Sequence, residues 1–224
     1  MNLFYEEKKI CICCNERVQK NEMEFVNKDI GICRVCQRRL EPVTKDSPFE
    51  GTPEVDYVFS AYYYNDTLKG LIGRYKFRRE RAIGLLFADM LYDRVRDIPI
   101  FDSLDFIAPM PLSLRRIKER SFNQAEVMAK YFSEVAGIPY STCVCRSKNT
   151  VPQSTLKARD RVKNITDSFV ADKSKVAGKH ILLFDDIFTT GSTMNDCAKE
   201  LKSKGASKVV GMTFAKAYRK YLHN

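Results

Sequence analysis

Residues 181–193, with the sequence ILLFDDIFTTGST, constrain the fold more than any other stretch of the chain. Residues 181–184 are predicted to form a buried parallel strand, because four apolar residues in a row are too few for a core helix. A helical pattern follows over residues 194–204. The small residues in between therefore form a loop where a strand end meets a helix N-terminus. Backbone N–H groups and the helix dipole favour an anion at such a place.

Two acidic residues and a run of hydroxylated residues lie between this strand and this helix. Gly191 lets the backbone pass close to a ligand, because no Cβ stands in the way. The other donors of the loop are the hydroxyls of Thr189, Thr190, Ser192 and Thr193. Asp185 and Asp186 suit a ligand that carries a diol beside its phosphate, together with a divalent cation. The plainer alternative is an acidic turn that caps an ordinary strand–helix unit.

The net charge of +10 is concentrated in the middle of the chain. Residues 1–55 carry nine Lys and Arg against ten Asp and Glu, whereas residues 112–163 carry eleven against four. Such a basic region suits a polyanionic ligand, for example pyrophosphate or nucleic acid. A solvated basic face is the alternative that charge alone leaves open.

Neither a signal peptide nor a membrane span is evident in the sequence. Residues 1–10 mix acidic and basic side chains without an apolar run. No apolar stretch approaches the roughly 20 residues that cross a bilayer. We therefore expect a cytoplasmic protein without a transmembrane segment. In the cytoplasm, eight cysteines indicate metal ligands or free thiols rather than disulfides.

Four of the cysteines form two CxxC knuckles, Cys11 with Cys14 and Cys33 with Cys36. Each knuckle places two thiolates on one side of a tight turn, and two knuckles complete a tetrahedral Zn²⁺ site. Four protein ligands leave no open coordination position, so this zinc is predicted to be structural. Cys13 could replace a neighbour, although only Cys11 and Cys14 have the usual spacing. The alternative is four unrelated reduced cysteines.

Apolar strands alternate with helical patterns over the rest of the chain, which predicts an α/β fold with a mostly parallel sheet. The expected strands are residues 56–64, 106–108, 181–184 and 208–214, and the expected helices are residues 68–75, 81–96, 124–135 and 194–204. Proline and glycine make the segment before the first strand a linker. The predicted divisions are a zinc-binding module at 1–41, a linker at 42–55 and the α/β domain at 56–224.

Two basic segments are predicted to be loops near the anion site. The first follows the strand at residues 106–108, where a doubly wound sheet places phosphate-binding groups. The second covers residues 146–163 and has the composition of a mobile loop. The candidate contacts to pyrophosphate or nucleic acid in the two segments are Arg115, Arg116, Arg120, Arg146, Arg159 and Arg161.

The order of apolar strand, two acidic residues and TTGST resembles the signature with which type I phosphoribosyltransferases bind 5-phosphoribosyl 1-pyrophosphate (PRPP). The resemblance implies that Asp185 and Asp186 hold the 2′- and 3′-hydroxyls of the ribose. It also implies that residues 189–193 hold the 5′-phosphate and that Mg²⁺ accompanies PRPP. The fold implied is a type I phosphoribosyltransferase sheet preceded by the four-cysteine zinc module.

A wider set of motifs is similar to the ComF family. Beside the cysteine module and the PRPP signature, these motifs are Arg74-Tyr75-Lys76-Phe77, Pro109-Met110-Pro111-Leu112-Ser113, Arg120-Ser121-Phe122-Asn123-Gln124-Ala125, Gln153-Ser154-Thr155-Leu156 and residues 159–164. The chain departs from the family at Ser121, where RGFNQ is usual and a glycine is expected.

The ComF resemblance implies a PRPP-binding protein that assists the uptake and internalisation of single-stranded DNA in natural transformation. Its implied partners are single-stranded DNA and a DNA-translocating helicase, and its implied location is the cytoplasm, including the periphery of a membrane uptake machine. One alternative is an active enzyme that transfers phosphoribosyl to an unidentified acceptor and releases pyrophosphate. A second alternative is an adaptor protein that acts through its zinc module and has only a vestigial sugar-phosphate site. No catalytic residue is assigned.

Overall fold

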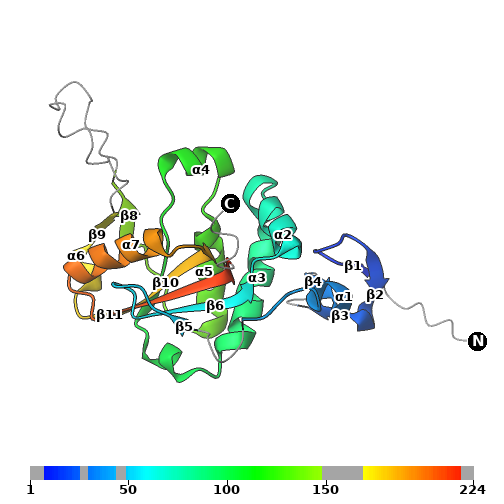
Figure 1. Cartoon of the computed structure of the whole chain (residues 1–224), viewed down its shortest axis with the longest axis horizontal. Helices are drawn as coiled ribbons and strands as arrows, with labels where there is room; N and C mark the ends of the chain where they lie inside the picture. The colour runs from blue at the N-terminus through cyan, green and yellow to red at the C-terminus, as the bar shows by residue number, and fades with distance from the viewer. Residues whose placement is uncertain (1–7, 26–29, 44–48, 148–168, 218–224) are drawn as a thin grey trace, which may run out of the picture.

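The protein, described by a computed structural model over residues 8–25, 30–43, 49–147 and 169–217, is built around a five-stranded sheet (Figure 1). Its strands, in the order β5-β6-β11-β10-β7, are β5 (Phe49–Glu50), β6 (Tyr57–Tyr63), β11 (Lys208–Lys216), β10 (His180–Phe188) and β7 (Phe106–Pro109). The last four run parallel, and β5 pairs antiparallel with β6. The predicted mostly parallel sheet is confirmed.

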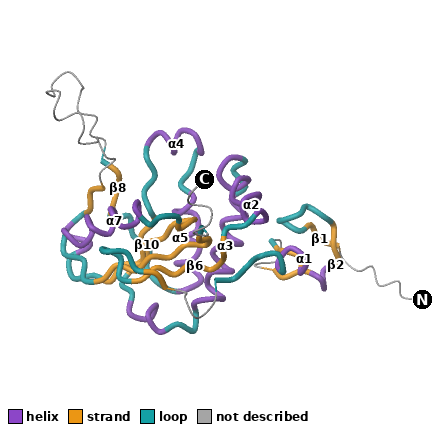
Figure 2. Tube along the Cα trace, viewed as in Figure 1, coloured by secondary structure: helices purple, strands orange, loops and turns teal. Residues whose placement is uncertain are grey.

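Helices lie on both faces of this sheet (Figure 2). The helical elements of the domain are α2 (Asp66–Phe77), α3 (Arg81–Val95), η2 (Pro99–Ser103), α4 (Leu114–Arg120), α5 (Gln124–Ala136), α6 (Lys173–Val176) and α7 (Ser192–Ser203). Leu182 and Phe184 of β10 pack in one cluster with α2, α3 and α5, whereas Ile181 and Leu183 pack in a second cluster with α7. β10 is therefore buried on both faces, as its continuous apolar run predicts. None of the described helices has the length and apolar character needed to cross a membrane.

β10 extends beyond the predicted residues 181–184 and includes both acidic residues. The extension forms because β11 pairs with β10 as far as Phe188, opposite Lys216. The other neighbour, β7, ends opposite Phe184. Asp185 and Asp186 therefore lie on a part of β10 that β7 leaves uncovered, and this places them at the edge of the sheet where a ligand can approach.

The first predicted basic loop is wrong, since residues 114–120 form α4. Ser113 caps this helix, with its Oγ accepting a hydrogen bond from the Arg116 backbone N–H at 3.4 Å. Arg115 and Glu119 form an i,i+4 ion pair along the helix. Figure 1 shows α4 at the tip of an arm between β7 and α5. The basic side chains of this segment are thus carried by a short helix above the sheet.

The second basic segment lies mostly outside the described residues. Arg146 ends β8 (Val144–Arg146), which pairs antiparallel with β9 (Phe169–Ala171). Residues 148–168, which include Arg159 and Arg161, are not described. The loop prediction for this segment therefore stays a prediction.

Both ends of the predicted linker contact the central sheet. The Val43 N–H donates to the Ala61 carbonyl at 2.9 Å, and Pro42 forms a bridge with Tyr62. At the other end, β5 adds a strand to the sheet edge, and the Glu54 N–H donates to Asn195 Oδ1 at 3.0 Å. The described residues of the segment are therefore held against β6 and α7. The division at residues 41 and 55 stays a prediction.

The N-terminal module consists of short elements beside α2 and α3 (Figure 1). They are β1 (Lys8–Ile10), β2 (Arg17–Gln19), η1 (Lys20–Glu22), β3 (Met23–Phe25), β4 (Gly31–Cys33) and α1 (Arg34–Gln37). The pairs β1–β2 and β3–β4 are antiparallel. Met23, Ile32 and Leu40 are buried in the same apolar cluster as α2 and α3. The small module thus shares its core with the larger domain.

Candidate functional site

A cavity of about 270 Å³ opens where β7 and β10 end and where α5 and α7 begin. Its walls include both acidic residues, part of the TTGST loop and four basic side chains from three elements. The basic residues are Lys76 of α2, Arg116 and Arg120 of α4, and Arg146 of β8. The cavity lies at the carboxyl edge of parallel strands, which is where open α/β sheets bind their ligands.

Three of the five predicted loop residues line this cavity. Thr189, Gly191 and Thr193 are part of the lining, whereas Thr190 and Ser192 are not. The hydroxyls of Thr190 and Ser192 hydrogen-bond to each other at 2.9 Å, and the Ser192 N–H donates to Thr190 Oγ1 at 3.3 Å. The loop is therefore braced by its own side chains at the N-terminus of α7, where the helix dipole favours an anion.

Gly191 is required by the backbone of this loop. Its φ of +77° lies in the left-handed region, where a side chain is strained. A Cβ at this position would lie 2.7 Å from Phe188 Cζ and 3.0 Å from Thr52 Cγ2. Backbone conformation and close packing thus require glycine here, in addition to the approach of a ligand that the sequence predicts.

The two acidic residues interact with each other and with Lys76. The Asp186 backbone N–H donates to Asp185 Oδ1 at 2.8 Å, and the Lys76 ammonium lies 2.7 Å from Asp186 Oδ2. Burial raises the pKa of Asp185, and the neighbouring Asp186 carboxylate raises it further, to about 7. The hydrogen bond from Asp186 and the charges of Lys76 and Arg116 oppose this rise. The pair thus presents acceptors to the cavity beside the Lys76 ammonium.

The predicted arginines divide into groups. Arg116, Arg120 and Arg146 line the cavity. Arg120 Nη1 donates to Gln124 Oε1 at 2.9 Å, and Arg146 Nε donates to the Pro111 carbonyl at 3.0 Å. Arg115 points away, because its side chain is 84% exposed and lies outside the lining. The structure thus brings three of the six candidates to the acidic pair, and Arg159 and Arg161 are outside the described residues.

Lys76 was not assigned to the site from the sequence, although it is part of the Arg74-Tyr75-Lys76-Phe77 motif. It reaches the cavity from the last turn of α2, more than a hundred residues before the acidic pair. Gln124 also lines the cavity, and its buried side chain fixes Arg120. The only sequence signal for both was membership of a family motif.

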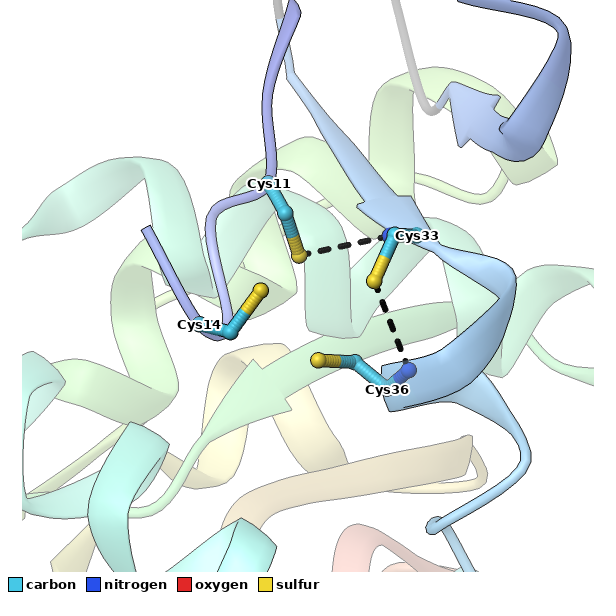
Figure 3. Close-up of side chains that lie close together, drawn as sticks. All are labelled: Cys11, Cys14, Cys33 and Cys36. Carbon is cyan, nitrogen blue, oxygen red and sulfur yellow. Dashed lines mark hydrogen bonds between the residues drawn. The ribbon is translucent and has the colours of Figure 1, made fainter. Parts of the chain in front are cut away.

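A second candidate site, for a metal ion, lies in the N-terminal module. The Sγ atoms of Cys11, Cys14, Cys33 and Cys36 lie within 4.8 Å of one another (Figure 3). Zinc–sulfur bonds of about 2.3 Å place the thiolates of a tetrahedral site about 3.8 Å apart, so the cluster fits zinc after a small contraction. The cluster that holds these four residues leaves out Cys13, which agrees with the predicted ligand set.

Backbone N–H groups stabilise thiolates in this cluster. Cys33 N–H donates to Cys11 Sγ at 3.3 Å, and Cys36 N–H donates to Cys33 Sγ at 3.5 Å (Figure 3). Burial alone would raise the pKa of Cys11, but the N–H groups of Cys14, Cys33 and Cys13 hold that pKa below its usual value. The thiolate is the form that binds zinc, so this lowering favours a metal ligand at Cys11, whereas burial raises the pKa of Cys14 and of Cys36. The four residues could hold such a metal.

Arg74 connects the cysteine module to the α/β domain. Its Nη1 donates to the carbonyls of Ile12 at 2.8 Å and Cys13 at 3.1 Å. Its Nε donates to both carboxylate oxygens of Glu80, at 3.0 and 3.1 Å. A guanidinium shared in this way fixes the first knuckle against the end of α2.

Comparison with known families shows the family to which the chain belongs. The family described as "Phosphoribosyl transferase domain" matches residues 84–223, which contain β7, β10, β11 and the TTGST loop. The chain belongs to this family. The mostly parallel sheet of the phosphoribosyltransferase domain is of type I, and the cavity lies at its carboxyl edge.

Several curated proteins resemble the chain over most of its length. Competence protein F of Haemophilus influenzae is 29% identical over 92% of this chain and 96% of its own length. Competence protein ComFC of Bacillus subtilis is 29% identical over 93% of this chain and 84% of its own. The DNA utilization protein YhgH of Salmonella typhimurium is 29% identical over 80% of this chain and 87% of its own. These homologues confirm the resemblance to ComF proteins.

Ser121 of the phosphoribosyltransferase domain lies where the ComF motif has a glycine, and its backbone explains that glycine. Ser121 ends α4 in the left-handed region, with φ at +68°. We expect Ser121→Gly to raise the free energy of unfolding by about 0.5–1 kcal/mol, because glycine adopts this conformation without strain. Ser133→Gly, inside α5, should instead lower it by roughly 1 kcal/mol, because glycine is a poorer helix former and the hydrogen bond from Ser133 Oγ to the Ile138 carbonyl is lost. Thermal melting of both variants checks this, and a less stable Ser121→Gly protein would contradict it.

Proposed function

We propose that this protein binds PRPP in the cavity at the carboxyl edge of its sheet and assists the uptake and internalisation of single-stranded DNA in natural transformation. The observation that carries the proposal is the convergence of unlike groups on one space of about 270 Å³. Acceptors, an anion-binding loop and cations are what a molecule with a diol, a phosphate and a pyrophosphate requires.

Each part of PRPP has a matching part of the cavity in this proposal. Asp185 and Asp186 accept hydrogen bonds from the ribose hydroxyls. Residues 189–193, at the N-terminus of α7, hold the 5′-phosphate, with Thr189, Gly191 and Thr193 in the cavity wall. Arg116, Arg120 and Arg146 balance the charge of the pyrophosphate, and Mg²⁺ accompanies it. Support comes from the membership of the phosphoribosyltransferase family and from the lining of the cavity.

The DNA-related half of the proposal rests on the relatives and on charge. Two of the relatives carry competence in their names, and a third is named a DNA utilization protein. The basic excess of residues 112–163 includes α4, whose arm stands out from the sheet (Figure 1). Positive charge on an exposed arm attracts a phosphate backbone with little regard to sequence. A DNA-translocating helicase is the partner that the ComF resemblance suggests.

Binding of single-stranded DNA over a salt series tests this half. Affinity should fall steeply with salt. Binding releases counterions from the strand, and this release is less favourable when the salt concentration is high. Reversal of Arg115, Arg116, Arg159 and Arg161 to Glu should reduce affinity at least about a hundredfold and flatten the salt slope by about 3. Lys173→Glu with Lys175→Glu, on the exposed side of α6, is the matched control and should bind normally. Unchanged DNA binding by the fourfold variant would contradict this assignment and indicate that the cysteine module contacts the DNA.

Transfer of phosphoribosyl to an acceptor is the second candidate function. The cations around the acidic pair favour it, because they can stabilise a departing pyrophosphate. Thr189 weighs against a free purine acceptor. Type I members that act on 6-oxopurines carry an aspartate at this position. A threonine hydroxyl stays protonated near neutral pH, so it cannot act as a general base. We expect no efficient turnover with free bases, and pyrophosphate release with PRPP, Mg²⁺ and each common base checks this.

A further inference from the structure

Lys76 engages the carboxylate that the proposed function needs for its ligand. Its ammonium lies in the cavity wall, 2.7 Å from Asp186 Oδ2. The side chains of Lys76 and Asp186 are only 14% and 10% exposed. In such surroundings an ion pair is stronger than at an open surface, and neither charge can be left without a partner at low cost. A ribose hydroxyl that binds Asp186 Oδ2 must therefore compete with Lys76 for that oxygen.

We propose that Lys76 is a specificity-determining residue, whose ammonium pairs with Asp186 in the free protein and moves to the pyrophosphate group when PRPP binds. This inference rests on the proposed function. PRPP replaces the ion pair that it breaks, because it supplies a new anion for the ammonium. Ribose 5-phosphate carries the same diol and 5′-phosphate but has no pyrophosphate, so it must separate Lys76 from Asp186 without replacement. The site thereby favours PRPP over the simpler sugar phosphate.

The surroundings of Lys76 allow its side chain to move while its helix stays in place. The preceding Tyr75 is fully buried, and its hydroxyl donates to the Gln124 carbonyl at 2.7 Å. Arg74 is held by Ile12, Cys13 and Glu80. The last turn of α2 is therefore fixed from two sides, and the four-carbon stem of Lys76 can carry the ammonium to a nearby anion.

Arg120 and Arg146, two other cations of the cavity, do not have this competing role. Arg120 is bound to Gln124 Oε1, and Arg146 is bound to the Pro111 carbonyl and lies over the Phe169 ring at 4.7 Å. The ribose is not proposed to bind Gln124 or the Pro111 carbonyl. Lys76, in contrast, pairs with Asp186, which the ribose is proposed to bind. Its release is therefore coupled to occupation of Asp186.

Calorimetric titration of the full chain with PRPP and with ribose 5-phosphate, both with Mg²⁺ at pH 8, tests the inference. Lys76→Met should weaken PRPP binding at least about tenfold, because a charge-assisted contact is lost. The same variant should bind ribose 5-phosphate within about threefold of the unmodified protein or more tightly, because the competitor for Asp186 is gone. Lys76→Gln, which keeps a polar side chain beside Asp186 but no charge, should show the same selective loss, and Lys76→Arg should restore most of the preference.

Lys69→Met, on the same helix but outside the cavity lining, is the matched control and should leave both affinities unchanged. If the Lys76 variants lost affinity for PRPP and for ribose 5-phosphate to the same extent, Lys76 would be only a structural residue and the inference would be overturned. Unchanged PRPP binding would also overturn it. If the unmodified protein binds no PRPP, the proposed function fails and the inference fails with it, and this outcome is visible before any variant is tested.

Discussion

Replacing Asp185 and Asp186 together by Ala should weaken PRPP binding at least about a hundredfold. Each hydrogen bond to a charged acceptor contributes about 1.5–3 kcal/mol, so two losses together exceed the roughly 2.7 kcal/mol of a hundredfold change. Both residues lie on the extension of β10 that pairs with β11 alone, so the core of the sheet is untouched. The variant should therefore remain folded, but it should melt at a lower temperature because Lys76 loses its partner.

Calorimetry with PRPP and Mg²⁺ measures this loss, and a thermal melt of the same sample confirms folding. Asp196→Ala is a suitable control, because Asp196 is an exposed acid on α7 outside the cavity lining. It should bind PRPP normally. Normal binding by the double variant would show that the ribose lies elsewhere and would remove the basis for assigning the acidic pair.

Loss of the metal should unfold the N-terminal module. We expect one zinc per chain, and Cys11→Ser with Cys33→Ser should remove it. Strands of three residues cannot be stable alone, so metal binding must supply much of the folding free energy of the module. Hydrogen exchange should then become fast over β1 to β4. β10 should stay protected, because it is buried between α7 on one face and α3 and α5 on the other.

Elemental analysis of purified protein gives the zinc content directly. The sharpest control is Cys13→Ala, since Cys13 is adjacent to the cluster in sequence but outside the four-cysteine set. Cys145→Ala, on β8, is a second control. Both should retain one zinc per chain. A Cys13 variant without zinc would mean that the ligand set is wrong, and a protein that never contains zinc would refute the metal site.

The parts of this protein that the sequence predicts are those whose signals are local. Residues 181–193 hold a strand, two acids, an anion loop and a helix start without interruption, so their order already implies their geometry. The four cysteines behave in the same way, because CxxC spacing fixes two ligands within one turn. Both sets are brought together in the structure.

The parts that were missed depend on contacts between distant residues. β10 continues through Asp185 and Asp186 because β11 runs beside it, and strand length cannot be read from the apolar run alone. Lys76 enters the site from α2 through tertiary packing. The charges of α4 suggest a ligand-binding loop, and this prediction is wrong. The sequence also contains a helix signal at this place, because Ser113 is a favourable N-cap residue.

Titration of the purified, zinc-containing protein with PRPP in a calorimeter, with and without Mg²⁺, tests the central claim most directly. We expect one PRPP per chain, tighter binding when Mg²⁺ is present, and competition by pyrophosphate for the same site. Absence of binding in both conditions, or affinity no greater than that for inorganic phosphate, would contradict it.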